Sequence, residues 1–530
     1  MPALLQAEGY LSASVDSIVT HDNLTTVYLF MGQRYEWGVV HIRPEERGVL
    51  QQTGMIIREA SVASAEVISG LPARIVDYYQ NRGYPFVKVK WDSVQLKGNR
   101  IHAVLAVDKG PLYRLDSVGI SGSLKISKQF LLQFLGISEG GVYNASVLEN
   151  IDSRLSELPY LQQSQPWQIT MQLTGFVINF YLQPGKSNQV NALLGLFPSS
   201  QQKNGRLLLA ADVDLLLQNA FGSGERVDFS WQQTQPRSPR LQFIYRHPFV
   251  LRSAFGLNLG FQLYKKDSSF LNINGSAGLE YRLGTKQSAT VMLGWQRTNL
   301  LEIDTNAIRI SRRLPDAADM SVTSIGLGYT FNSTDYRNNP RKGVELTFSL
   351  SAGKKTIRRN NSITSLKDGG FDYRSLYDSV RMTSYQLRIS FSGSDYFRLG
   401  THSVLKAGIQ SGLLQTPDYF RNEMFQAGGY RLMRGFDEES IFASAFAVTT
   451  VEYRYRVNQG SYFFVFTDLG YTSDRSRPSR AEHRYIGAGG GLAFEARAGL
   501  FNLAIAVGKR DDLRLNLRQT KLHIGYTSFF

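Results

Sequence analysis

The chain has 530 residues, 42% of them hydrophobic, and a formal net charge of +15. That length is too great for one ordinary soluble domain, so we expect two or more domains. The lack of cysteine excludes disulfides and cysteine-ligated metal sites, and the lack of an apolar run of about eighteen residues excludes a conventional transmembrane helix. The basic residues are scattered rather than gathered in a tract. The charge therefore fits anionic lipid or lipopolysaccharide, and we expect no nucleic-acid partner.

Residues 1–187 mix short strands with amphipathic helices in one pattern that occurs three times. The pattern is a helix followed by two strands that a turn connects. It is cut short in residues 1–35 and complete in residues 36–111 and 112–187. A repeat length of about seventy residues indicates tandem small α+β domains.

The second copy shows the pattern most clearly. The spacing predicts a helix over Leu71–Asn81 with Pro72 in its first turn, where a missing N–H costs nothing. A strand is predicted over Pro85–Trp91, and a turn and a second strand follow it. Val87–Trp91, and Phe176–Leu182 in the third copy, are candidate free sheet edges where extended peptides dock. A structural spacer is the alternative use of either segment.

From residue 188 to residue 530 the helical spacing disappears, and about sixteen strand-like runs follow. Many runs are longer than the roughly five or six residues usual in globular sheets. Alternation is cleanest over residues 255–263, where Phe and Leu alternate with Gly, Asn and Gln. Short turns also alternate with long loops. A soluble sandwich would bury the apolar face, but the number and length of the strands favour an antiparallel transmembrane β-barrel that turns this face to lipid.

A long loop over residues 416–442 carries an arginine next to a glycine, and two later strands each carry one acid on the face that alternation turns inward. One guanidinium can bind two carboxylates at once with fixed geometry, which an ammonium cannot. The glycine lets the loop approach a wall closely. The residues alone leave two interpretations, a buried ion cluster in the barrel lumen or independent exposed charges. The loop motif is Met433, Arg434, Gly435 and Phe436; the lumenal acids are Glu452 and Asp468; and the motif aromatic is Phe466.

The final strand alternates apolar and polar residues, ends on an aromatic residue and resembles the terminal signal of outer-membrane barrels. Barrel closure must pair it with the first strand, near residues 189–197. Gly525 and Pro198 lie where this pairing is weak, because glycine loosens a strand and proline donates no ladder hydrogen bond. We therefore expect a lateral seam that opens and pairs with a client strand, with a permanently closed barrel as the alternative. The seam and signal residues are Leu522, Ile524, Gly525, Tyr526 and Phe530.

Together these residues resemble the BamA/TamA family of outer-membrane assembly and translocation barrels. Met433–Phe436 is similar to the family's Val/Ile-Arg-Gly-Phe/Tyr motif on the sixth extracellular loop, with methionine at the first position. Glu452 and Phe466–Asp468 resemble the family's acidic lumenal partners on strands twelve and thirteen. Asn219–Glu225 and Asp335–Gly343 resemble further family turns. The resemblance implies N-terminal tandem α+β POTRA (polypeptide-transport-associated) domains followed by an all-β, 16-stranded antiparallel transmembrane β-barrel.

The resemblance also implies the outer membrane of a Gram-negative bacterium, with the POTRA domains in the periplasm. It implies a factor that inserts or translocates unfolded barrel clients through POTRA docking and the lateral seam, with a periplasmic or inner-membrane partner bound through the POTRA domains. Three POTRA units resemble the TamA type more than five-unit BamA or two-unit secretion partners. Two alternatives stay open: a two-partner secretion pore that exports one dedicated exoprotein, and a passive outer-membrane channel with loop six as its plug.

No enzymatic site is expected. The seven histidines are dispersed without metal-ligand spacing. The run Gly487–Gly491 lies inside an alternating strand and opens no helix, so it lacks the geometry of a phosphate-binding loop, and small residues here more simply make room for the inserted loop. We therefore predict no metal, nucleotide or other cofactor. Met1–Leu5 has neither the basic start nor the apolar core of a signal peptide, so we expect the numbering to begin after processing or at a truncated start.

Overall fold

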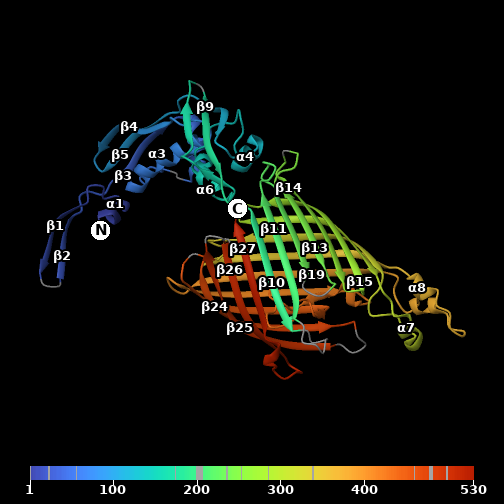
Figure 1. The fold of residues 1–530 in the computed structure, drawn as a ribbon. Helices are drawn as coiled ribbons and strands as arrows, with labels where there is room; N and C mark the ends of the chain where they lie inside the picture. Colours follow the sequence, from blue (N-terminus) through green and yellow to red (C-terminus); the bar gives the residue numbers. More distant parts are fainter. Residues whose placement is uncertain are drawn as a thin grey trace. The chain divides into compact units, whose positions relative to one another are not determined.

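The chain forms two compact units, Met1–Gly185 and Lys186–Phe530, shown in Figure 1. The computed structural model describes residues 2–21, 24–54, 57–173, 175–198, 207–233, 237–251, 253–284, 286–336, 339–458, 460–476, 481–496 and 499–529. No helix within these residues is both long and apolar enough to cross a membrane.

The first unit contains three successive groups of elements. Helix α1 precedes a hairpin of β1 and β2. In the second group, β5 pairs in parallel with β3 and antiparallel with β4, in the order β3-β5-β4, and helices α2 and α3 accompany this sheet. In the third group, β9 pairs with β6, β7 and β8, and α4, α5 and α6 accompany it. The bounds are α1 Pro2–Ala7, β1 Ser14–His21, β2 Leu24–Phe30, β3 Glu36–Ile42, α2 Pro44–Thr53, α3 Ala65–Gln80, β4 Lys88–Lys97, β5 Arg100–Asp108, β6 Arg114–Ser121, α4 Lys128–Leu135, α5 Ala145–Glu149, α6 Ile151–Ser156, β7 Leu161–Gln163, β8 Gln168–Met171 and β9 Gly175–Pro184.

Helix α3 begins at Ala65 rather than at the predicted Leu71. Ser64 caps it by accepting a hydrogen bond from the Val67 N–H at 3.3 Å, so Pro72 lies inside the helix and its predicted place in the first turn is wrong. Proline has no N–H to donate to the carbonyl four residues earlier, that of Ile68. The indole Nε1–H of Trp91, on β4, donates to this carbonyl at 2.7 Å. The sheet thus supplies the hydrogen bond that the helix lacks.

Replacing Trp91 by phenylalanine should destabilise α3 by about 1–2 kcal/mol, because the Ile68 carbonyl loses its partner. In a Pro72→Ala background the cost should be smaller, since the N–H that alanine brings to this position restores the helical bond. Hydrogen exchange of the α3 amides in the full chain measures both effects. An equal cost in the two backgrounds would show that Trp91 acts through packing alone.

The two candidate docking edges differ in outcome. Phe176–Leu182 lies in β9, which has β6 on one side and β7 and β8 on the other, so the prediction that it forms a free edge is wrong. The reason is the parallel β6–β9 pairing, which places the last strand of the group in its centre. The predicted strand Pro85–Trp91 begins at Lys88 and continues to Lys97 as β4, which lies at one edge of the described β3-β5-β4 sheet.

Within the described residues, sixteen antiparallel strands form a closed barrel in the second unit. The strands follow one another in chain order, and β27 pairs back to β10, as Figure 1 shows. The predicted fold class, α+β elements followed by a 16-stranded antiparallel barrel, is confirmed. The bounds are β10 Gln189–Pro198, β11 Leu207–Gln218, β12 Arg226–Gln233, β13 Arg240–His247, β14 Phe255–Lys266, β15 Phe270–Arg282, β16 Gln287–Leu300, β17 Met320–Asn332, β18 Gly343–Ile357, β19 Thr383–Arg398, β20 Ser403–Gln415, β23 Ala445–Arg456, β24 Tyr462–Asp474, β25 Ala481–Ala496, β26 Gly499–Arg510 and β27 Lys521–Phe529.

Strand β24 shows how the two faces of the barrel wall differ. Phe463 and Val465 point outward and are 55% and 58% exposed, whereas Phe464, Phe466 and Asp468 between and after them are buried. A row of large apolar side chains on the outside is stable in lipid and costly in water. The alternation therefore places apolar residues toward the membrane and the acid toward the interior.

The connections alternate between the two ends of the barrel because consecutive strands are antiparallel. Short turns follow β11, β15, β19 and β23 at one end, and long loops follow β16, β18 and β20 at the other. The long loops carry α7 (Thr305–Ser311), α8 (Asn361–Thr364) and the 3-10 helix η1 (Tyr373–Tyr377), and α7 and α8 are visible at this end in Figure 1. Their side chains form a small hydrophobic core of their own, which includes Ile308, Ile363, Tyr373, Tyr377 and Phe420.

Candidate functional site

Loop six is the connection between β20 and β23, residues 416–444, and it forms a short stem of its own. β21 (Phe425–Ala427) pairs antiparallel with β22 (Ile441–Ala443). Gly428 and Gly429 follow β21 with φ angles of +106° and +102°, a region that favours glycine, so the chain turns directly after the stem. The tip, residues 428–440, then contacts side chains on the inward faces of the barrel strands.

Arg434 binds two carboxylates at once. Its backbone N–H and its Nε–H both donate to Asp468 Oδ2 at 2.9 Å, and its Nη2 donates to Asp468 Oδ1 at 2.8 Å. Its Nη1 donates to Glu452 Oε2 at 2.6 Å. All three side chains are buried. The structure therefore brings together Arg434 of loop six, Glu452 of β23 and Asp468 of β24, which we call the Arg434 cluster.

The remaining motif residues pack around this cluster. The Arg434 guanidinium carbon lies 3.4 Å from the centroid of the Phe466 ring, a cation–π contact in a buried setting. The Phe436 ring meets the Tyr485 ring edge-on, with centroids 5.3 Å apart. Met433 is fully buried against Tyr485 and Val448.

Glycines supply the space that the loop occupies. Gly435 has a φ of +91°, and a Cβ on it would lie 2.5 Å from the Val507 carbonyl carbon on β26. A Cβ on Gly487 would collide with the Arg434 carbonyl oxygen, and one on Gly508 would lie 2.7 Å from the Phe436 ring. Any larger residue at these positions would displace the loop, because two of these contacts involve backbone atoms. Gly487, within the run that was unlike a phosphate-binding loop, therefore makes room for loop six.

The cluster contains further members that the sequence interpretation missed. Arg454 Nε donates to Glu452 Oε1 at 2.8 Å, and Arg454 Nη1 donates to Asn339 Oδ1 at 3.2 Å. Thr450 Oγ1 donates to Asp468 Oδ1 at 2.8 Å. Thr450, Glu452 and Arg454 alternate along β23 and so share one face. The signal was therefore present in the alternation that placed Glu452 inward.

A second buried ion pair lies where loop six leaves β20. Lys355 Nζ, on β18, donates to Glu423 Oε1 at 2.6 Å and to the Asp418 carbonyl at 2.6 Å, and neither charged side chain is more than 2% exposed. Asn422 beside it donates to the Ala318 carbonyl at 2.8 Å and accepts from the Ala318 N–H at 3.2 Å. The base of loop six is thus tied to the loop before β17 and to β18.

Replacing Lys355 by methionine should destabilise the barrel by about 3–5 kcal/mol, because Glu423 would stay buried without its counter-ion. Adding Glu423→Gln should recover much of the loss. The unfolding temperature of the detergent-folded protein measures both, with Lys367→Met at an exposed loop lysine as the matched control. If Lys355→Met alone unfolded at the wild-type temperature, the stabilising role of this ion pair would be contradicted.

The first and last strands meet along eight described residue pairs, from Gln189 opposite Phe529 to Leu196 opposite Leu522. Ile524 lies opposite Leu194, and Gly525 lies between Leu193 and Asn502. Phe530 lies outside the described residues.

Two further seam residues, Tyr526 and Pro198, differ in their contacts. Tyr526 opposes Ala192, and its ring centroid lies 4.9 Å from that of Phe501. Pro198 opposes Leu207 of β11, beyond the last pair with β27. The described seam is therefore paired from Gln189 to Leu196, and Pro198 lies at its rim, beyond the last pair.

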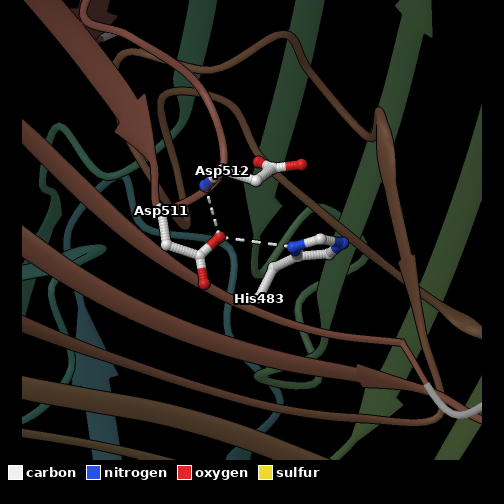
Figure 2. A group of neighbouring side chains, drawn as sticks. All are labelled: His483, Asp511 and Asp512. Atoms are coloured by element: carbon white, nitrogen blue, oxygen red, sulfur yellow. Dashed lines mark hydrogen bonds and ion pairs between the residues drawn. The ribbon is translucent and has the colours of Figure 1, made fainter.

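Within the described residues, one group of metal-ligating residue types, His483, Asp511 and Asp512, gathers near the end of β26 (Figure 2). Asp511 accepts from the Asp512 N–H at 2.9 Å and from the Arg484 N–H at 3.1 Å, and Asp512 forms two hydrogen bonds with Arg510, at 2.5 and 3.0 Å. The Arg484 N–H is the largest cause that lowers the pKa of Asp511. Because these contacts satisfy both carboxylates, we assign no metal to this group.

The barrel sequence matches a known protein family. A family model described as the Omp85 superfamily domain matches residues 219–527. No curated protein matches the sequence.

Three solved structures share the fold at 13% identity. BamA from Haemophilus ducreyi lacking POTRA domains 1–3 has a TM-score of 0.52, covering 93% of this chain and 99% of its own. CdiB from Acinetobacter baumannii and CdiB from Escherichia coli both have a TM-score of 0.57; the matches cover 94% and 99% of this chain and 90% and 95% of theirs.

Proposed function

Because this chain belongs to the Omp85 superfamily, we propose that it inserts or translocates client proteins at the outer membrane through the seam between β10 and β27. It is an outer-membrane β-barrel protein with a POTRA-like N-terminal region. Members of the family are barrel-assembly and secretion proteins without enzymatic activity, and we extend that property to this chain.

The observation that carries the lateral route is that β10 and β27, the first and last barrel strands, are neighbours that no loop connects. Their pairing is also short: they share eight described residue pairs, as do β11 and β12, and β12 and β13 share seven, whereas β18 and β19 share fourteen. Parting β27 from β10 therefore breaks fewer rows of hydrogen bonds than parting the long strands of the opposite wall. The freed edge would offer unpaired N–H and C=O groups that a client strand can pair with.

The N-terminal region is proposed to dock clients in the periplasm. We divide it into a partial POTRA domain, residues 1–35, and two complete ones, residues 36–111 and 112–187, which the order of helices and strands supports. β4 offers a sheet edge to which an extended segment could add as a further strand. The same edge would serve a periplasmic or inner-membrane partner.

Outer-membrane lipid and lipopolysaccharide are the remaining proposed partners. The exposed Phe and Val side chains on the outer face of β24 suit acyl chains. The net charge of +15 suits anionic headgroups.

Depletion followed by quantitative proteomics of the outer membrane tests the proposal. Loss of many barrel proteins is the result expected for a general insertion factor. Loss of one secreted exoprotein alone would identify a dedicated secretion pore instead. If no outer-membrane or secreted protein changes while the purified chain conducts ions, the chain is a passive channel and the proposal is wrong.

A further inference from the structure

The tip of loop six, residues 428–440, is fastened mainly to the wall on the C-terminal side of the seam. The Arg434 cluster joins it to β23 and β24, and these strands lead through β25 and β26 to β27. Asp437 Oδ1 accepts from Lys521 Nζ, on β27 itself, at 2.5 Å. The Tyr430 ring lies 5.0 Å from the His523 ring, also on β27. These contacts hold the loop and the last strands together as one body.

Two residues of the tip form ion pairs with the wall on the other side of the seam. Arg431 Nη2 lies 2.9 Å from Asp212 Oδ2 and 2.5 Å from Asp214 Oδ2, both on β11. Glu439 forms an ion pair with Arg240 on β13. We call these the cross-seam ion pairs.

The register shows what the cross-seam ion pairs span. β10 lies between β11 and β27, and Asp214, Asn191 and Thr527 form one row across the three strands. Two strand spacings amount to about 9–10 Å. The seven residues from Arg431 to Asp437 are long enough to cover this distance, and they contact β11 at one end and β27 at the other.

The backbone of Glu439 supports a specific role for its contact. Glu439 has a φ of +53°, in the left-handed region that residues other than glycine, asparagine and aspartate seldom adopt. Its partner Arg240 also stacks on the Tyr264 ring, with Cζ 4.4 Å from the ring centroid, which fixes the guanidinium on the wall. A strained residue held against a fixed partner marks a contact that the surrounding structure maintains.

We propose that loop six holds the seam closed through Arg431 and Glu439, and that all three cross-seam ion pairs must break before β10 parts from β27. The inference deepens the proposed function and rests on the seam being its route. Arg431 is 54% exposed and borders a cavity of about 320 Å³ that Arg226, Asp228 and Arg246 also line, so water, salt and a charged client segment can reach its ion pairs. The buried Arg434 cluster stays in place meanwhile and acts as the pivot.

Hydrogen exchange in lipid nanodiscs measures seam opening directly. The double variant Arg431→Gln/Glu439→Gln should exchange its β10 and β27 amides about fivefold faster or more, because the three cross-seam ion pairs no longer oppose opening. Exchange in β15–β18 should not change. The control Arg313→Gln/Glu302→Gln removes the same charges from exposed positions on the loop before β17 and should leave seam exchange at the wild-type rate. Unchanged seam exchange in the first variant, or faster exchange throughout the barrel, would overturn the inference.

Salt gives a second measurement on the unmodified chain. Raising the ionic strength from about 0.05 M to about 0.5 M shortens the screening length below roughly 5 Å and weakens exposed ion pairs more than buried ones. Seam exchange should therefore accelerate with salt in the wild type and much less in Arg431→Gln/Glu439→Gln. Equal salt dependence in the two proteins would count against the cross-seam ion pairs as the closing element.

The proposed function and the inference can fail separately. If a disulfide across the seam leaves client insertion at full rate, the lateral route is wrong, whatever the exchange data show. If that disulfide stops insertion but seam exchange ignores Arg431 and Glu439, the route stands and only the closing role of loop six is wrong. Asp214→Asn combined with Arg431→Gln completes a double-mutant cycle, in which additive effects on seam exchange would mean that the two residues are not coupled.

Discussion

Replacing Arg434 by alanine is expected to destabilise the barrel by about 3–5 kcal/mol and to lower the yield of folded protein in the outer membrane. The variant removes both side-chain hydrogen bonds to Asp468 and the one to Glu452, and leaves these acids buried close together. Arg454 still offsets the charge of Glu452, so Asp468 should account for most of the loss. The fraction of chain that keeps the mobility of a folded barrel on unheated gels reports the yield, and urea unfolding in detergent reports the stability.

Two further variants show whether geometry or charge is responsible. Arg434→Lys keeps the charge but cannot bind two carboxylates with fixed geometry, so we expect an intermediate loss. Arg313→Ala removes an exposed arginine from another loop and should behave as the wild type. If Arg434→Ala matched Arg313→Ala in yield, stability and client insertion, the Arg434 cluster would have no role in either folding or function.

A disulfide between cysteines at positions 194 and 524 is expected to stop client insertion, and reduction is expected to restore it. Leu194 and Ile524 lie directly opposite each other across the seam. Opposed residues of an antiparallel pair have Cβ atoms about 4.5–5.5 Å apart, which small adjustments bring within disulfide range. The chain has no cysteine of its own, so the engineered pair has no competing thiol.

The matched control places the same cross-link where no opening is proposed. Leu293 of β16 and Ile325 of β17 are directly opposed, and both are exposed on the outer face. A disulfide between cysteines at these positions should form as readily and leave insertion unchanged. Full insertion with the seam cross-linked would remove the lateral route, and equal loss in both cross-linked proteins would show that oxidation itself harms the barrel.

The barrel could be predicted from the sequence because apolar and polar residues alternate along each of its strands. The same alternation turned Glu452 and Asp468 inward, and the neighbouring Gly435 indicated a close approach by the loop. What the sequence could not supply are contacts between distant segments. Arg431 with Asp214, and Lys355 with Glu423, join residues whose separation follows no local period, so each remained one charge among many until the structure placed it beside its partner.

The two wrong predictions in the N-terminal unit have the same origin. Pro72 was placed in a first turn because proline is well tolerated there, but Ser64 caps the helix earlier and Trp91, from another element, satisfies the carbonyl that Pro72 leaves free. Phe176–Leu182 is predicted to be a sheet edge but lies in the middle of its sheet. Strand order depends on which strands pair, and alternation within one strand does not reveal that order.

The contacts of loop six also differ in how far apart their partners lie along the chain, which bears on how this protein folds. Arg434 is 18 residues from Glu452 and 34 from Asp468, whereas Arg431 is 217 residues from Asp214. The entropy lost on closing a chain segment grows with the logarithm of its length, so the longer closure costs about 1–2 kcal/mol more. Loop six therefore loses less chain entropy when it binds β23 and β24 than when it binds β11. It can bind these neighbouring strands first, and the rest of the barrel can then close around it.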